Sequence, residues 1–208
     1  EEDDRFELFA VDVRARAFGA PVKLNGPLSP GGDVGSAVPG EEFDWAWPVW
    51  APDGEKVAFA ADSKQDGEVA LYVAEVAQPP GLSKVSQPFA ADRKLGDFAL
   101  ADGTRLLYWS APRSAGAEQL MVVDTTASPG TVKMLAAPAQ GSIPRVVSDP
   151  LGRGILYANG SLYWMDWYWQ DWQGSAPRRL YGPIASSWGL YEPRFSADRD
   201  TALLDVAY

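Results

Sequence analysis

The sequence predicts an all-β protein, a β-propeller built from four-stranded antiparallel blades, of which four are counted. Three observations lead to this prediction. A pattern of turns and strands recurs with a constant spacing. The two ends of the 208-residue chain supply complementary halves of that pattern, and the 20 glycines and 17 prolines exceed what a helical protein tolerates.

The first complete copy of the pattern begins at residues 50–54, Trp-Ala-Pro-Asp-Gly, where a Pro-Asp-Gly turn leads into the apolar strand 55–60. A strand rich in β-formers covers 71–76, and a Pro-Pro-Gly turn then precedes a last strand at 82–85. Together with the segment 47–50 before the turn, these strands make one four-stranded blade.

The same order of turns and strands recurs downstream. Asp102 stands in a turn like that of Asp53 and follows it by 49 positions. Leu120 occupies the same place in its strand as Leu71 and also follows it by 49 positions. Two independent landmarks with one offset indicate a repeat.

A looser third copy and two half-copies complete the pattern. The third copy runs over 149–180 and has a tight Asn-Gly hairpin turn at 159–160. The segment 8–24 matches the third and fourth strands of a blade, and 191–205 matches the first and second. Pairing of the two half-blades would close a ring without open strand edges. The alternatives are a piece of a longer propeller, or two copies that complete a larger ring.

The predicted organisation is a single propeller domain over the whole chain. Its parts are the half-blade 5–26, a Gly/Pro/Ser-rich flexible linker 27–43, the blades 44–90, 94–138 and 142–183, and the half-blade 188–208. In a propeller the first strand of each blade lines the central channel. The inner strands are therefore expected at 47–50, 95–100, 143–147 and 190–195, and the loops beside them at the main concave site.

The pattern of residues 50–59, followed by Leu-Tyr-Val-Ala-Glu at 71–75, resembles the TolB-type (WD-like) β-propeller repeat, with Ala51 where serine is usual. The resemblance covers most of the chain apart from 27–43. Relatives of this kind include periplasmic translocation proteins, the gating propellers of prolyl-oligopeptidase-like peptidases, and some polysaccharide-active enzymes. The resemblance thus implies an extracytoplasmic location, periplasmic or secreted. Six or more blades are usual in these families, against the four counted here.

The composition excludes several kinds of chemistry. With 0 cysteines and 0 histidines the chain has no disulfide, no thiol nucleophile and no histidine general base. A net charge of −10 repels phosphate backbones, which argues against a nucleic-acid partner, and its simplest role is solubility. No apolar stretch approaches the roughly 18 residues of a membrane span.

The run 164–172 is the least ordinary segment and contains Trp164, Trp167, Trp169 and Trp172. Two-residue alternation places Trp167 and Trp169 on one face of a strand. These indoles are candidates for an aromatic platform that binds a sugar ring, a peptide or a partner protein. The alternative is that they fill gaps between blades.

A second group of aromatic side chains stands where the chain enters the outer blades. Trp45 and Trp47 alternate at the entry to the first complete blade, and Trp188 and Tyr191 occupy the corresponding entry to the last. We consider all four as ligand- or partner-binding candidates if they face the same rim. The alternative is a structural role at blade junctions.

The acidic side chains predict neither a catalytic pair nor a metal site. Asp62 and Asp66 belong to one hairpin and Asp166 and Asp171 to another, and nothing in the sequence sets two of them across a cleft. Calcium requires closely spaced oxygen ligands, but Lys64 interrupts the one suitable loop. We therefore expect no catalytic residues, no metal and no cofactor.

The leading functional hypothesis is a non-enzymatic scaffold that binds a protein or peptide partner through the channel rim or the Trp-rich edge. The alternatives are a carbohydrate-binding or carbohydrate-active propeller, and the regulatory propeller of a prolyl-oligopeptidase-like peptidase. The assembly is expected to be a monomer or a homodimer.

Overall fold

The computed structural model of the chain is all-β. It describes residues 6–13, 19–35, 47–77, 79–89, 93–112, 118–126, 130–136, 142–149, 152–161, 164–185, 194–195 and 202–203. Within these ranges every regular element is a β-strand, and none is a helix. The chain divides into two compact units, 1–108 with 123–132 and 109–122 with 133–208.

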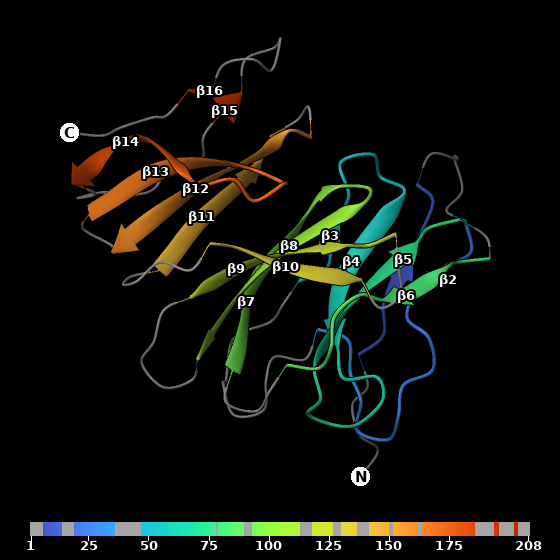
Figure 1. Cartoon of the computed structure of the whole chain (residues 1–208). Coiled ribbons are helices and arrows are strands. Elements are labelled where there is room, and N and C mark those ends of the chain that lie inside the picture. The colour runs from blue at the N-terminus through green and yellow to red at the C-terminus, as the bar shows by residue number, and fades with distance from the viewer. Residues whose placement is uncertain are drawn as a thin grey trace. The chain divides into compact units, whose positions relative to one another are not determined.

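Three antiparallel sheets of four strands carry the repeat (Figure 1). Blade 1 consists of β3 (Val49–Trp50), β4 (Lys56–Ala61), β5 (Ala70–Glu75) and β6 (Leu82–Lys84). Blade 2 consists of β7 (Arg93–Asp102), β8 (Arg105–Pro112), β9 (Gln119–Asp124) and β10 (Thr131–Ala136). Blade 3 consists of β11 (Ser142–Ser148), β12 (Gly154–Ser161), β13 (Trp164–Asp171) and β14 (Arg178–Ala185).

In each blade the strands lie side by side in chain order, with the first strand at one edge. This is the blade topology that the repeat predicts, and the strands expected around Leu71 and Leu120 are β5 and β9. The fold is a β-propeller of four-stranded antiparallel blades, as predicted. The blade boundaries themselves stay a prediction.

The two half-blades are also present as hairpins. β1 (Phe9–Ala10) pairs with β2 (Val22–Lys23), and β15 (Arg194–Phe195) pairs with β16 (Ala202–Leu203). In the described residues each hairpin is a sheet of its own. Closure of a ring by pairing between the two hairpins therefore stays a prediction.

The core of the first unit forms where the N-terminal half-blade packs on blade 1. Phe59 of β4 and Tyr72 of β5 are cross-strand partners, and their rings stack with centroids 5.7 Å apart. Ala10 and Leu24 of the half-blade belong to the same buried cluster. Alternation along β1 then directs Phe9 away from this core, where about half of its side chain is exposed.

The core of the second unit is built on β12 and β13. Ile155, Leu156 and Ala158 of β12 are buried, as are Trp167 and Gln170 of β13. The Gln170 amide donates hydrogen bonds to the carbonyls of Leu135, at 2.9 Å, and Ser175, at 3.0 Å. A buried amide of this kind holds the loop after β13 to its own blade.

The first part of the predicted linker makes ordered contacts. Ser29 N donates to Ser63 O at 3.0 Å, and Asp62 N donates to Asp33 O at 3.2 Å. Val34, an isolated apolar residue in this Gly/Pro/Ser-rich stretch, forms an antiparallel bridge with Ala61 and is buried. Residues 29–34 of the predicted linker are therefore held to the β4–β5 hairpin by backbone hydrogen bonds and by a buried side chain.

Candidate functional site: a pocket at the interrupted first strand of blade 1

The first strand of blade 1 is much shorter than its counterparts. β3 has 2 residues, whereas β7 has 10 and β11 has 7. Pro48 immediately precedes β3, and a proline has no backbone N–H with which to extend the ladder along β4. The register of β3 on β4 therefore stops at Val49 opposite Ala58.

A segment of the predicted linker occupies the place along β4 that a longer β3 would take. Val34 bridges to Ala61, and Gly35 N donates to Ala60 O at 2.8 Å. On its other side Val34 N donates to Phe6 O at 3.0 Å. Residues 34–35 thus join the N-terminal strand segment to β4, and the blade edge along β4 is made of two separate pieces, residues 34–35 and β3.

The buried carboxylate of Asp62 and the half-buried carboxylate of Asp33 fix this joining segment. Both oxygens of Asp62 are used: Oδ1 accepts from Asp33 N at 2.5 Å and Oδ2 from Gly67 N at 3.0 Å. The Asp33 carboxylate in turn accepts from Phe6 N at 2.8 Å. Asp62 therefore organises the β4–β5 hairpin and the joining segment, and these bonds account for the buried carboxylate without a metal ion.

An apolar pocket of about 300 Å³ lies between these two pieces of the blade edge. Its lining residues are Phe6, Glu7, Leu8, Val34, Gly35, Trp47 and Pro48. This volume is at the lower end of the range for ligand sites, and it suits one or two large apolar side chains. The Glu7 carboxylate, the one ionisable side chain in the lining, forms an ion pair with Lys23.

The mouth of the pocket carries exposed aromatic surface. Trp47 is 76% exposed and Phe6 50% exposed, although both line the pocket. Trp50, three residues further on, is 55% exposed and does not line it. Large aromatic side chains that stay exposed beside an apolar hollow are a common mark of an interaction site.

The Trp-rich run lies in β13 and its following loop, in the other compact unit. Trp167 is cross-strand partner of Ala158 and Tyr181, and only 4% of its side chain is exposed. Trp169 is half-buried, and its ring lies so near Gly154 that a Cβ there would come within 2.9 Å of Cζ2. These two indoles contribute mainly to the packing of blade 3.

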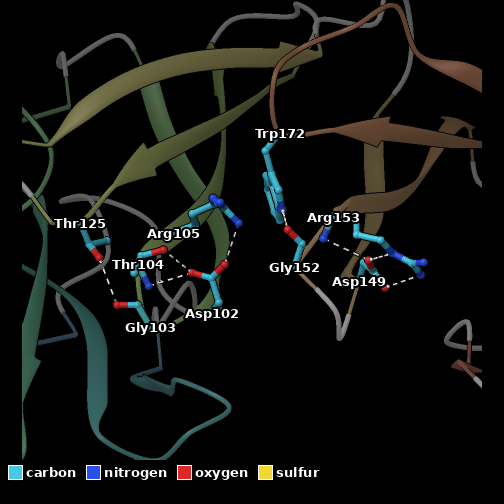
Figure 2. A network of polar contacts seen from close by, with 9 residues as sticks. All are labelled: Asp102, Gly103, Thr104, Arg105, Thr125, Asp149, Gly152, Arg153 and Trp172. Atoms are coloured by element: carbon cyan, nitrogen blue, oxygen red, sulfur yellow. Dashed lines mark hydrogen bonds and ion pairs between the residues drawn. The ribbon is translucent and has the colours of Figure 1, made fainter. Parts of the chain in front are cut away.

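Trp172 has a defined structural partner. Its Nε1 donates to Gly152 O at 2.9 Å, across the corner between β11 and β12 (Figure 2). In blade 2, Thr125 occupies the same place after the third strand, and its Oγ1 reaches Gly103 O at 3.5 Å (Figure 2). The indole thus reinforces a corner that a smaller side chain serves in the neighbouring repeat.

The other predicted aromatic candidates lie wholly or partly outside the described residues. Trp164 starts β13 opposite Ser161, and its side chain lies outside the described residues. Trp45, Trp188 and Tyr191 lie outside them altogether. Of the candidates, Trp47 is the one that the described structure places at a pocket.

The carboxylates of blade 3 serve turns and ion pairs. Asp166 accepts from Arg179 at 2.8 Å. Asp171 accepts from the Ser175 hydroxyl at 2.7 Å, and the Ser175 hydrogen bonds lower the pKa of Asp171. Within the described residues no three His, Cys, Asp or Glu side chains gather as a metal site would require.

Trp47 was a candidate from the sequence, whereas the other residues that line the pocket were not. The sequence pattern indicates only that Phe6 and Leu8 are ordinary strand residues. Their exposure depends on what packs beside them, which the pattern does not contain. Val34 gave a faint signal, since it is one of the few large apolar residues in the Gly/Pro/Ser-rich stretch 27–43 and such residues favour burial. In the described residues no helix is long and apolar enough to cross a membrane.

Comparison with known proteins gives a likeness of fold. No family model matches the chain, and no curated protein matches it. Dipeptidyl peptidase 4 of Porphyromonas gingivalis has a TM-score of 0.56 and 17% identity, over 84% of this chain and 29% of that chain. A prolyl oligopeptidase B from Galerina marginata has a TM-score of 0.51 and 11% identity, over 80% of this chain and 22% of that chain.

A putative TolB from Agrobacterium tumefaciens is also similar, with a TM-score of 0.49 and 12% identity, over 78% of this chain and 53% of that chain. The chain spans less than a third of the length of either peptidase. At these identities the likeness concerns the propeller architecture. The fold of the chain is that of a propeller, and a shared fold does not by itself determine an activity.

Proposed function

We propose that this chain is a non-enzymatic β-propeller scaffold that binds a protein or peptide partner at the pocket beside Trp47. The observation that carries the proposal is a 76% exposed indole at the mouth of an apolar pocket of about 300 Å³. An indole in this position contributes a large contact area with few rotamers to immobilise, which is typical of residues that dominate interfaces. The fold-level resemblance of the repeat to TolB-type propellers supports an extracytoplasmic setting.

A peptide suits the pocket better than a carbohydrate does. The lining is apolar apart from Glu7, whose carboxylate is paired with Lys23. A sugar ring would stack on Trp47 but would find few groups to bind its hydroxyls, whereas an apolar side chain needs none. The carbohydrate alternative predicts binding on a glycan array that is lost in Trp47→Ala.

The third alternative, the regulatory propeller of a larger peptidase, concerns what is attached to the chain. The two peptidases with similar folds are much longer than this chain, which spans 29% and 22% of them. A catalytic domain encoded next to this propeller in the same gene would support that alternative. Binding at Trp47 would then serve to admit or hold a substrate peptide.

The test is a selection of 12-residue synthetic peptides from a random pool on the intact chain, followed by fluorescence-polarisation titration. Trp47→Ala is expected to weaken the best binders at least tenfold, as the loss of a central aromatic anchor does. The matched control is Trp50→Ala, which removes an exposed indole outside the pocket and should change affinity less than twofold. Mass spectrometry of the peptides should show no cleavage. Equal binding by the wild type and Trp47→Ala would refute the proposal.

A further inference from the structure

Resting on the proposed function for its biological role, we infer that Asn25 and Asp33 are positioning residues of the pocket. Their side chains hold the strand segment 6–8, which forms one wall of the pocket and is named the wall. Neither Asn25 nor Asp33 lines the pocket itself. Each accepts a hydrogen bond from a backbone N–H of the wall, and together they set its place in the pocket that Trp47 also lines.

The wall contributes three of the seven residues that line the pocket, namely Phe6, Glu7 and Leu8. It precedes β1, whose ladder with β2 starts at Phe9 opposite Lys23. The backbone of the wall is therefore held by groups other than this ladder. Its position decides whether the pocket forms, because a concave apolar site needs all of its sides.

Asn25 holds the C-terminal end of the wall. Leu24 N donates to Leu8 O at 2.8 Å, as in an antiparallel ladder, where the residue opposite would also accept from Leu8 N. Leu8 N donates instead to Asn25 Oδ1 at 2.8 Å. Asn25 Nδ2 donates to Gly26 O at 3.0 Å, and the residue is only 5% exposed, so its amide is fixed. This side chain thus takes the place of a main-chain carbonyl.

Asp33 holds the N-terminal end of the wall in the same way. Phe6 N donates to Asp33 Oδ1 at 2.8 Å, and Val34 N donates to Phe6 O at 3.0 Å. Asp33 N in turn donates to the carboxylate of the buried Asp62. At both ends, therefore, a main-chain N–H donates to a carbonyl of the wall, and a side-chain oxygen accepts from the N–H of the same wall residue.

Loss of these side chains should affect the pocket more than the rest of the unit. The pocket joins three chain segments, the wall, 34–35 and 47–48, whereas the buried core of the unit is built mainly on β4 and β5. Removal of the Asn25 oxygen leaves Leu8 N–H without its acceptor, and the wall can then open locally while β4 and β5 stay folded. Affinity for a molecule in the pocket should therefore fall by more than overall stability explains.

The experiment uses indole as a neutral aromatic probe of the pocket in the intact chain. Binding is titrated through the amide chemical shift of Gly35, a lining residue. Asn25→Leu keeps the side-chain size and removes the acceptor, so it should weaken indole binding about fivefold or more and speed hydrogen exchange of the Leu8 amide about tenfold or more. Asn25→Asp keeps an acceptor for Leu8 N and should bind indole within about threefold of the wild type.

Two variants of Asp33 repeat the test at the other end of the wall. Asp33→Ala removes the acceptor of Phe6 N and should also weaken indole binding about fivefold or more. Asp33→Asn keeps an acceptor and should preserve affinity within about threefold.

Ser86→Ala is the matched control for Asn25→Leu. Ser86 is 2% exposed and lies outside the pocket lining, where its hydroxyl accepts from Leu71 N at 2.8 Å and donates to Gln87 O at 2.9 Å. Both variants leave a main-chain N–H without its side-chain acceptor. Ser86→Ala should lower the urea midpoint of unfolding by a similar amount and yet leave indole affinity within about twofold.

The outcomes separate this inference from the proposed function. Faster exchange of the Leu8 amide in Asn25→Leu with unchanged indole affinity would overturn the inference and leave the peptide-binding scaffold. An equal loss of affinity in Ser86→Ala would also overturn it, because affinity would then follow overall stability. Selected peptides that bind the wild type and Trp47→Ala equally would refute the proposed partner but not the positioning of the wall. Failure of the wild type to bind indole would overturn both.

Discussion

Blade 1 and blade 3 share a scaffold but use their tryptophans differently. In both, an aromatic residue of the second strand stacks on a tyrosine opposite in the third: Phe59 on Tyr72 at 5.7 Å, and Tyr157 on Tyr168 at 5.4 Å. Trp167 and Trp169 of β13, however, lie between two long neighbouring strands, where Trp167 is buried and Trp169 half-buried.

In blade 1 the edge strand β3 is cut short, and Trp47 stands just outside the ladder beside a hollow. The difference shows that an abundance of tryptophan does not mark the interaction site. For Trp47 and Trp167 the exposure follows the strand beside the residue. Trp47 is exposed where the ladder is interrupted, and Trp167 is buried where the ladder is complete.

The largest expected effect is the difference in stability between replacing the buried Trp167 and replacing the exposed Trp47 by alanine. Trp167→Ala removes a side chain that is 4% exposed and should cost about 3–5 kcal/mol of unfolding free energy, because it leaves a cavity. Trp47→Ala removes a side chain that is 76% exposed and should cost about 0.5 kcal/mol or less. Urea denaturation followed by circular dichroism measures both. Equal costs would contradict the contrast between the two blades.

The stack of blade 3 has the ionisable Tyr157 where the stack of blade 1 has Phe59. The effect of this difference on stability can be tested at alkaline pH. Burial, followed by the neighbouring Tyr168, raises the pKa of Tyr157 from 10.0 to about 12. Between these values the unfolded chain loses a proton that the folded chain keeps. The contribution of Tyr157 to the free energy of unfolding is therefore fully present below about pH 10. It declines by about 3 kcal/mol as the pH rises to about 12.

Tyr157→Phe recreates the Phe–Tyr pair of blade 1 and should lessen that decline by about the same 3 kcal/mol, measured by urea denaturation from about pH 8 to about pH 12. The pKa values of Tyr168 and Tyr108 are also raised, so wild type and variant must be compared at each pH. Identical pH profiles would mean that Tyr157 ionises as it does in the unfolded chain.

The repeat could be predicted from sequence because its signals are local. The Pro-Asp-Gly turn before β4 and the β-formers of β5 each depend on neighbours within a few positions, and the same kind of local pattern recurs 49 residues later at β9. The ladder along β4 was not predictable in the same way. Pairing between Val34 and Ala61 joins residues 27 positions apart, and no turn signal or periodicity in the sequence predicts it.

The candidate site was predictable only in part for the same reason. Alternation placed Trp167 and Trp169 on one face of a strand, but it could not say whether that face is covered. Trp47 was recognised as an aromatic residue at a blade entry. Its pocket depends on Phe6 and Val34, which reach it from two other segments of the chain.

A smaller effect should follow from releasing the joining segment of blade 1. Asp62→Ala leaves the amides of Asp33 and Gly67 without their acceptor and should cost about 2 kcal/mol. The nearby exposed Asp66→Ala is the control and should cost about 0.5 kcal/mol or less. Millimolar calcium should stabilise neither the wild type nor the variants. Stabilisation of the wild type alone would instead favour a metal role for Asp62.

The smallest effect should distinguish the corners of blades 2 and 3. Trp172→Phe removes the 2.9 Å bond to Gly152 O and should cost about 1 kcal/mol more than Trp169→Phe, a half-buried tryptophan without that bond. Thr125→Val removes a contact of 3.5 Å, at the limit of a hydrogen bond, and should cost about 0.5 kcal/mol or less. Thermal unfolding of the three variants resolves this order. If Trp172→Phe proved as mild as Trp169→Phe, the hydrogen bond at the corner would contribute nothing, and Trp172 would again be available as a binding residue of blade 3.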